Sequence, residues 1–122
     1  MTDVVDIQQK FSLFDAPWQP KIVGDVNGMQ VKLARLQGAF EWHAHAEEDE
    51  MFLVIEGVLV MQFRDRTERI EPGQFIIVPR GVEHLPSSEG DECKVMLFEP
   101  ASTLNTGDGA DSDRTFRELE TI

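Results

Sequence analysis

Short stretches rich in Val, Ile, Leu and Phe follow one another from Lys21 to Pro100, and a turn signal closes each stretch. No helical period is visible in this part of the chain. Such a pattern is typical of an antiparallel sandwich or barrel. It predicts nine short strands, at Lys21–Val26, Met29–Leu36, Phe40–His45, Glu50–Ile55, Val58–Phe63, Thr67–Ile70, Phe75–Val78, Glu83–Ser87 and Glu92–Glu99.

Nine strands without intervening helices leave too many free edges for one open sheet. Closure into a barrel or a double-sheet jelly roll removes those edges, so we expect an all-β fold of this kind. Asn27-Gly28 is a strong signal for a two-residue hairpin turn, because both residues tolerate a positive φ. The pattern divides the chain into an N-terminal extension at 1–20, a barrel domain at 21–100 and a C-terminal tail at 101–122.

The two ends of the chain follow different patterns. The segment Asp6–Phe14 predicts a short helix or an irregular segment, with Asp6 as its N-cap and Ile7, Phe11 and Phe14 facing inward. After Pro100 the sequence is rich in turn residues, and Arg114–Ile122 fits a last strand or a last helix. We expect this tail to pack on the barrel or on a dimer partner.

Composition narrows the range of partners. The chain has 122 residues and a formal charge of −12, from 11 basic and 23 acidic residues. One domain of this size builds a core without disulfides or structural metal. The acidic excess argues against nucleic acid and against anionic membranes, both of which attract clustered Lys and Arg. Cys93 is the lone cysteine, so no intrachain disulfide is possible and a cytoplasmic location is the default expectation.

Three histidines carry most of the functional information. His43 and His45 stand two residues apart in a predicted strand, so their imidazoles leave the same face of the sheet. Glu50 begins the next strand, and His84 follows the turn Pro79-Arg80-Gly81. Closure of the barrel can bring three imidazoles and one carboxylate to one interior point, a ligand set that suits a divalent transition metal. The alternative is that these histidines are ordinary packed or surface residues.

The residues around the histidines resemble both sequence motifs of the cupin superfamily. Gly38, His43, His45, Glu50 and Gly57 nearly match G-x5-H-x-H-x3,4-E-x6-G, with four residues instead of five after the first glycine. The second motif, G-x5-P-x-G-x2-H-x3-N, is similar at its first four positions and has serine in place of asparagine. Those four positions are Gly73, Pro79, Gly81 and His84, and the serine is Ser88. The segments Phe98–Pro100 and Leu104–Gly107 also resemble small stand-alone bacterial cupins.

This resemblance implies a cupin-type jelly-roll β-barrel, also called a double-stranded β-helix. It implies His43, His45, Glu50 and His84 as ligands of one divalent ion, which is Fe, Mn, Ni or Zn. Glu48 or Asp49 remains an alternative to Glu50, because all lie in one acidic run.

Strand alternation extends the list of candidate interior residues. Glu41 shares parity with the two nearby histidines and is a candidate catalytic base, unless the strand bends and turns it to solvent. By this alternation, Phe40 and Trp42 pack on the other face of that strand. The candidate substrate pocket consists of Phe52, Val54, Arg80, Met96 and Phe98.

The resulting expectation is a metal-dependent enzyme, of dioxygenase or isomerase type, that acts on a small organic molecule. The alternatives are a non-catalytic barrel that binds or senses a metabolite or metal, and a structural barrel whose histidines bind nothing. We also expect a homodimer, because apolar strand faces such as Met51, Leu53 and Ile55 need cover and because the resemblance implies pairing through one sheet and the terminal segments.

Overall fold

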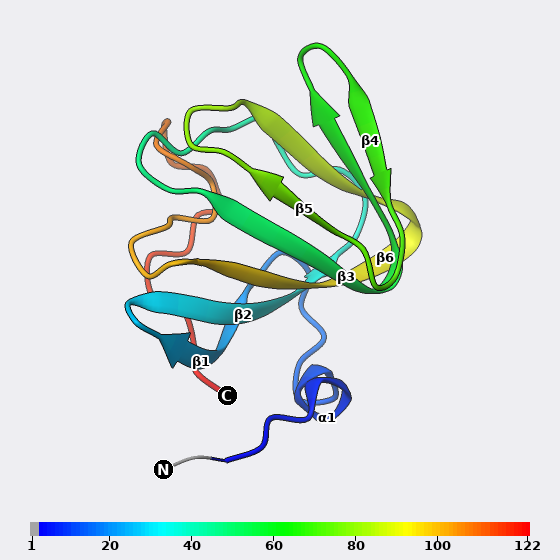
Figure 1. Ribbon diagram of the computed structural model, residues 1–122, viewed down its shortest axis with the longest axis vertical. Coiled ribbons are helices and arrows are strands. Elements are labelled where there is room, and N and C mark those ends of the chain that lie inside the picture. Colours follow the sequence, from blue (N-terminus) through cyan, green and yellow to red (C-terminus); the bar gives the residue numbers. More distant parts are fainter. Residues whose placement is uncertain (1–2) are drawn as a thin grey trace.

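The structure is a computed structural model that describes residues 3–122 of the chain. One helix, α1 (Ile7–Phe11), precedes six strands. Figure 1 shows these strands wrapped around one interior, with α1 at one side and the C-terminus close to β1. The strands are β1 (Lys21–Val26), β2 (Met29–Leu36), β3 (Glu50–Phe63), β4 (Thr67–Ile70), β5 (Phe75–Val78) and β6 (His84–Pro100).

The sheet is antiparallel and follows the order β1-β2-β6-β3-β4, and β5 pairs with β3. The first half of β3 lies between β5 and the end of β6, while its second half lies between β4 and the start of β6. The register of β3 and β6 shifts between Val54 and Val58, which marks bulges that bend the long strands. The expected jelly-roll fold is therefore confirmed.

The long strands replace several predicted short ones. Glu50–Ile55 and Val58–Phe63 are both parts of β3, and the two last predicted strands merge into β6. The predicted strand Phe40–His45 is wrong, because this segment forms only isolated bridges, Ala39 with Ser87 and His43 with His84.

The predicted N-cap of the helix is confirmed. Asp6 accepts a hydrogen bond from the backbone N–H of Gln9 at 3.1 Å. Arg35 on β2 then holds the end of this segment, because its guanidinium donates to the carbonyls of Phe11 and Phe14 at 2.8 and 2.9 Å. No helix in the described residues is long and apolar enough to cross a membrane.

The C-terminal tail forms neither a further helix nor a further strand within the described residues. It is held against the barrel by a backbone bridge and by hydrogen bonds. Thr121 forms a parallel bridge with Ile22 on β1, and Asp108 accepts a hydrogen bond from the backbone N–H of Ala46. Arg114 donates to the carbonyl of Ala39 at 3.0 Å.

Alternate residues of the central strands point into the barrel. On β3 the inward set begins with Glu50, Phe52 and Val54, and on β2 it includes Lys32, Ala34 and Leu36. The apolar core consists of Trp18, Ala34, Leu36, Phe52, Val54, Leu59, Met61, Phe63, Ile70, Val78, Cys93, Val95 and Leu97.

We predict that Gly57→Ala destabilises the fold far more than Gly73→Ala. Both glycines have a positive φ, 80° and 83°, where a side chain costs about 1 kcal/mol or more. A Cβ on Gly57 would also lie 2.5 Å from the carbonyl oxygen of Glu92, whereas a Cβ on Gly73 meets open space. Urea unfolding should show a loss of roughly 3 kcal/mol for Gly57→Ala and about 1 kcal/mol for Gly73→Ala. Equal losses would contradict the close approach of β3 and β6.

Candidate metal centre

A backbone bridge brings the first and second histidine segments together. His43 donates its N–H to the carbonyl of His84 at 3.1 Å, and His84 donates to the carbonyl of His43 at 2.9 Å. The two imidazole rings therefore lie side by side, with centroids 4.3 Å apart. His45 follows two residues later and is also buried.

Backbone carbonyls orient two of the imidazoles. Nδ1 of His43 lies 2.9 Å from the carbonyl oxygen of Glu41, and Nδ1 of His84 lies 2.9 Å from that of Val82. A carbonyl only accepts, so each Nδ1 carries a proton, and in neutral His43 this leaves the lone pair on Nε2. A second ring nitrogen held in this way is typical of histidines that bind metals.

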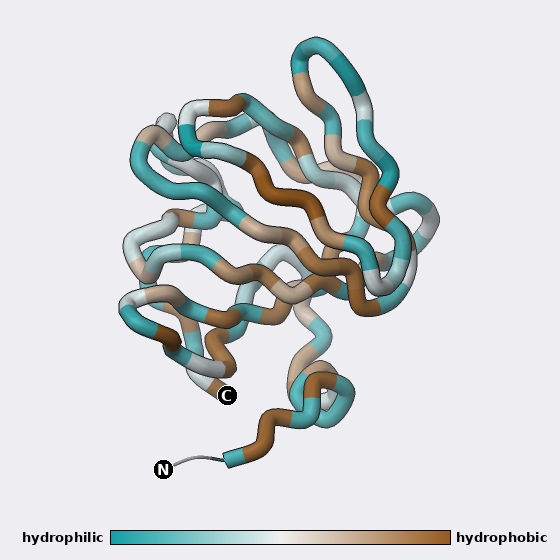
Figure 2. The backbone as a smooth tube through the Cα atoms, viewed as in Figure 1, coloured by the Kyte–Doolittle hydropathy of each residue, from teal (hydrophilic) through white to brown (hydrophobic). Residues whose placement is uncertain are grey.

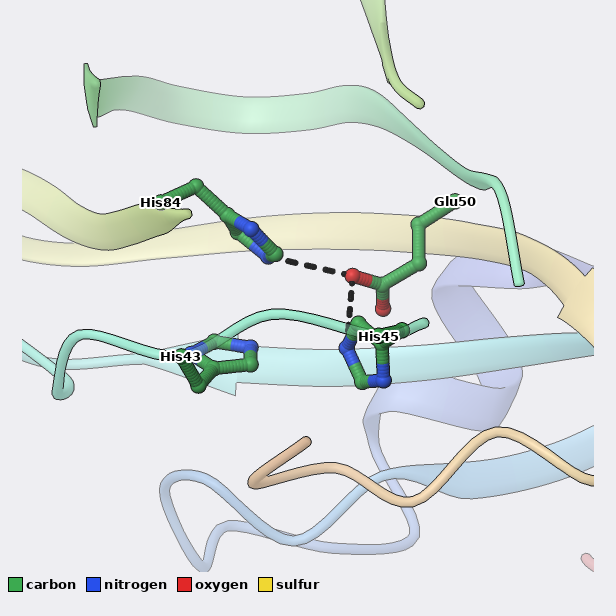
Figure 3. Close-up of side chains that lie close together, drawn as sticks. All are labelled: His43, His45, Glu50 and His84. Atoms are coloured by element: carbon green, nitrogen blue, oxygen red, sulfur yellow. Dashed lines mark hydrogen bonds and ion pairs between the residues drawn. The ribbon is translucent and has the colours of Figure 1, made fainter. Parts of the chain in front are cut away.

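Glu50 completes the cluster from the start of β3. Its Oε1 lies 3.0 Å from Nε2 of His45 and 3.1 Å from Nε2 of His84, as Figure 3 shows. One ligand atom from each of His43, His45, Glu50 and His84 lies within 4.8 Å of the others, and all four residues are buried. The structure thus brings together the four residues that the sequence analysis selected.

The other acidic residues of the loop have different partners. Asp49 accepts a hydrogen bond from the backbone N–H of Arg80 at 2.8 Å, and Glu48 accepts from the Ser102 hydroxyl at 2.9 Å. Glu48 also approaches Nδ1 of His45, at 4.0 Å, on the side away from Glu50. Glu50 is therefore the carboxylate that faces the three imidazoles.

The environment sets the charges of the cluster. Burial, and then the neighbouring His84, lower the pKa of His43 to about 4. Burial opposes charge on Glu50 as well, but hydrogen bonds from His45 and His84 outweigh it and hold the pKa of Glu50 well below its usual value. For His45, burial is outweighed by the hydrogen bond and the charge of Glu50, so its pKa is raised.

The residues present fit a divalent transition metal. Both ring nitrogens of His45 are buried and lack a well-aligned hydrogen-bond partner, although Nε2 is close to Glu50. Neutral imidazoles and an ionised carboxylate are the protonation states that bind a metal, and they suit Mn, Fe, Ni or Zn. An ion would satisfy Nε2 of His45 and the charge of Glu50 at once, whereas Nδ1 of His45 faces Glu48.

A cavity adjoins the cluster inside the barrel. The volume open to the centres of water molecules in this cavity is about 40 Å³, which is room for about three waters. The walls of the cavity are mostly apolar and include Trp18, Leu36, Phe40, Phe52, Pro86 and Leu97. Its polar groups come from His43, Glu50, Glu99 and Asn105.

Comparison with known proteins identifies the family. The Cupin domain family matches residues 31–99, more than half of the chain. This chain belongs to the cupin family. A crystal structure of a cupin-2 domain protein from Shewanella frigidimarina is 42% identical, with a TM-score of 0.78, and the match covers 80% of this chain and 94% of that one.

Two curated proteins also match this cupin. YdbB of Bacillus subtilis (strain 168) is 35% identical over 63 residues, which are 51% of this chain and 56% of that protein. The auxin-binding protein ABP19b of Prunus persica is 32% identical over 75 residues, 54% of this chain and 36% of that protein. The matches therefore span about half of one curated relative and about a third of the other.

Of the expected pocket residues, some point into the cupin barrel and the others lie outside it. Phe52 lines the cavity, and Val54 is a buried core residue that does not reach it. Arg80, whose side chain is mostly exposed, pairs with Asp49 at 3.6 Å and is not part of the cavity wall. Its position at an exposed turn explains this, so its placement in the pocket is wrong.

Met96 and Phe98 are also misplaced by the sequence analysis. In the ladder Val54 stands opposite Val95 and Phe52 opposite Leu97, so these side chains face inward together. Met96 and Phe98 have the opposite parity and pair with Leu53 and Met51 on the outer face. The sequence shows the alternation along this strand, but it does not show which of the two alternating sets of residues faces the interior.

Glu41 is not in the interior either. Both oxygens of its carboxylate lie near the Ser112 hydroxyl, at 3.2 and 3.3 Å, and Glu41 lines a recess on the outside of the barrel that also touches His43. The parity argument failed because residues 40–45 are not a regular strand. For the same reason Phe40, expected on the other face, packs on the core and lines the cavity.

Sequence reasoning missed two charged residues of the interior, Lys32 and Glu99. Lys32 shares parity with Ala34 and Leu36 on β2, and Glu99 shares parity with Val95 and Leu97 on β6. The signal was a charged residue at the end of an apolar alternation on each strand. Burial, and then the charge of Glu50, raise the pKa of Glu99 well above its usual value.

We predict that His43 makes the metal-free protein lose stability as the pH falls from about 6.5 to about 4. The unfolded chain protonates His43 near 6.5, whereas the folded chain resists protonation until about 4, so acid favours unfolding. The loss is about 3 kcal/mol. Over this range His45, with its raised pKa, contributes a constant amount, and Glu50 adds a loss of its own only at the acid end, where the unfolded chain protonates it near pH 4.5.

Urea unfolding at several pH values, with a chelator present, measures this effect. His43→Gln should flatten the pH dependence by about 3 kcal/mol between pH 6.5 and 4. An unchanged pH dependence in this variant would contradict the assignment to His43.

Proposed function

We propose that this cupin is a metal-dependent enzyme that acts on a small organic molecule. The observation that carries the proposal is the meeting of three imidazoles and one carboxylate in a buried position beside an apolar cavity. His43, His45, His84 and Glu50 would hold one divalent ion, and their donor types suit Fe, Mn, Ni or Zn. A small molecule in the adjoining cavity, which His43 and Glu50 line, would lie beside such an ion.

The residues of the chain have distinct tasks in this proposal. The backbone carbonyls of Glu41 and Val82 keep two imidazoles in the orientation that binds metal. Glu50 compensates the charge of the ion, and the aromatic wall keeps bulk water away from the reacting groups. When bound, the ion supplies Lewis-acid chemistry, or oxygen chemistry if it is iron.

A test of activity starts with protein purified without an affinity tag and loaded anaerobically with each of the four metals. Oxygen uptake and product formation are then followed with a panel of small neutral hydroxylated compounds. Turnover that requires one metal supports the enzyme. Stoichiometric metal and ligand-induced thermal shifts, without turnover of any compound, would contradict catalysis and support a protein that only binds its ligand. This second candidate function is favoured by the name of ABP19b, an auxin-binding protein.

The metal site itself generates the next prediction. His43→Ala, His45→Ala and His84→Ala should each lower metal affinity tenfold or more, because each removes one of four ligands, and Glu50→Gln should weaken it as well. Glu47→Gln is the matched control, because Glu47 is an exposed residue of the same loop. Mass spectrometry of bound metal checks these variants. Full occupancy after loss of any two histidines would refute the site.

We further propose that two copies of the chain pair through the outer face of β5, β3 and β6. Phe75 and Ile77 on β5 are 58% and 55% exposed, and they stand opposite Leu53 and Met51. Met96 and Phe98 continue both rows on β6. Figure 2 shows β5 as one of the most hydrophobic stretches of the chain. None of these six side chains is charged, so a second copy of the same face can cover them without burying a charge.

Light scattering at micromolar concentration tests this pairing, and the wild type should show the mass of a dimer. Ile77→Glu should give a monomer, because it places a charge at the centre of the proposed interface. Leu13→Glu, at an exposed apolar position outside this face, should remain dimeric. A monomeric wild type would overturn the proposal.

A further inference from the structure

The three imidazoles of the cluster differ in what their second ring nitrogen contacts. Nδ1 of His43 and Nδ1 of His84 each lie 2.9 Å from a backbone carbonyl oxygen. Nδ1 of His45 has no hydrogen-bond partner in the described part of the chain, although this side chain is only 2% exposed. In Figure 3 the dashed line from Glu50 reaches the other nitrogen of the ring. A buried nitrogen without a partner costs free energy, so it indicates a ligand that the chain itself does not supply.

Two carboxylates from different segments lie near this nitrogen. Oε1 of Glu48 is 4.0 Å from Nδ1 of His45, which is too long for a hydrogen bond. Asp108 joins them from the C-terminal tail, and one ligand atom of each of the three residues lies within 4.8 Å of the others. Bonds from zinc to nitrogen and to oxygen are each about 2.1 Å long, so one ion can reach both atoms across a gap of this size. Three donors thus converge on the side of His45 that faces away from Glu50.

Hydrogen bonds orient both carboxylates and leave one oxygen of each without a donor among residues 3–122. Oε2 of Glu48 accepts from the Ser102 hydroxyl at 2.9 Å, and Oδ2 of Asp108 accepts from the backbone N–H of Ala46. Neither carboxylate forms an ion pair with a Lys or Arg side chain in this range. Two carboxylates held this close repel each other unless a cation lies between them. Their arrangement therefore favours a bound cation.

The backbone of the tail brings Asp108 to this position. Gly107, at a φ of 79°, lies so close to the loop that a Cβ on it would be 2.5 Å from the carbonyl oxygen of Ala44. The N–H of Asp108 then donates to the same carbonyl at 3.0 Å. The match to the Cupin domain family covers residues 31–99, so Asp108 belongs to a segment outside it. The three-residue cluster therefore combines the loop of His45 and Glu48 with a part of the chain that the family match does not include.

The cluster is open to solvent on one side. Exposure decreases from Asp108, which is exposed, to the side chain of Glu48, at 11%, and to His45, at 2%. Asp108 and Glu41 also line the recess on the outside of the barrel, whose described wall contains no Lys or Arg side chain. Acidic walls of this kind raise the local concentration of cations. An ion can therefore reach the cluster without passing through the barrel interior.

We propose that His45, Glu48 and Asp108 form a second divalent-cation site, the outer site, and that His45 bridges it to the candidate metal centre. Nε2 of His45 faces Glu50, and Nδ1 faces the outer site. One imidazole and two carboxylates suit Zn or Mn, which accept both nitrogen and oxygen ligands. An ion that binds Nδ1 replaces the proton of this nitrogen, which goes to solvent. The outer site goes beyond the proposed enzyme and does not require turnover.

Zinc uptake by the full chain tests the outer site. Protein purified without an affinity tag is stripped with a chelator, desalted and titrated with zinc, and native mass spectrometry counts the ions bound per chain. The variants are Glu48→Gln and Asp108→Asn. In each, the amide oxygen keeps the hydrogen bond that the carboxylate accepts, and an amide nitrogen that cannot bind a cation replaces the other oxygen. The matched controls are Glu47→Gln and Asp113→Asn, which change exposed acids of the same loop and the same tail.

We expect two zinc ions per wild-type chain. Glu48→Gln and Asp108→Asn should each weaken the binding of one ion tenfold or more and keep the other, because each removes one of three ligands of the outer site. Both controls should bind two ions, as the wild type does. Amide hydrogen exchange in residues 104–108 should slow when the second ion binds to the wild type, and it should not slow in Asp108→Asn.

The outer site and the candidate metal centre fail in different ways. The outer site is overturned if the wild type binds one ion that Asp108→Asn keeps, or if a second ion binds equally well to both variants. It is also overturned if both variants weaken a single ion that His84→Ala loses, because Glu48 and Asp108 then only orient His45. A single ion that His84→Ala keeps and Asp108→Asn loses overturns the candidate metal centre and supports the outer site.

Discussion

The pairing of β3 with β6 is the constraint on which the rest of the structure depends. These two strands share one ladder that runs from Met51 opposite Phe98 to Phe63 opposite His84. In a flat sheet Glu50 and His84 would therefore lie at opposite ends of β3. The bulges near Gly57 bend the ladder, and closure of the barrel brings the two side chains to 3.1 Å. The candidate metal centre is a product of this curvature.

The interior of the barrel contains more charge than its stability requires. Glu50, Lys32 and Glu99 are buried beside three histidines, and burying such groups costs free energy unless each has a partner. Two imidazoles compensate Glu50, and Lys32 compensates one oxygen of Glu99. The apolar core that surrounds them stabilises the fold. Polar groups retained at such a cost, next to a cavity, are characteristic of a functional site.

The cupin family and the terminal segments contribute different parts of this site. The four candidate ligands lie within residues 31–99, which match the family. Trp18 and Asn105 line the cavity from outside that range, one from the N-terminal extension and one from the C-terminal tail. The match therefore covers the histidine cluster and leaves two walls of the cavity to segments of this chain. Because function depends on the site and not on the fold, we expect these segments to influence which molecule binds.

Much of the architecture was predictable from local pattern. Strand alternation, the Asn27-Gly28 turn and the Asp6 cap are short-range features, and the structure contains each of them. The spacing of His43 and His45, and their similarity to a known motif, also selected the cluster. What alternation alone did not settle is phase. Alternation divides the residues of a strand into two sets but does not say which set faces the interior. Met96 and Phe98 were therefore assigned inward, although Leu97 and Glu99 point there.

The sequence by itself thus determined the fold class and the four residues that meet in the barrel, because both depend on turn chemistry and on residue spacing. Tertiary structure alone decided the rest. The bridge between His43 and His84 replaced a strand and turned Glu41 to the outside. Closure of the barrel placed Lys32 against Glu99 from positions far apart in the chain, and the docked terminal segments shaped the cavity. Such contacts depend on how the sheet curves, which no local pattern of residues encodes.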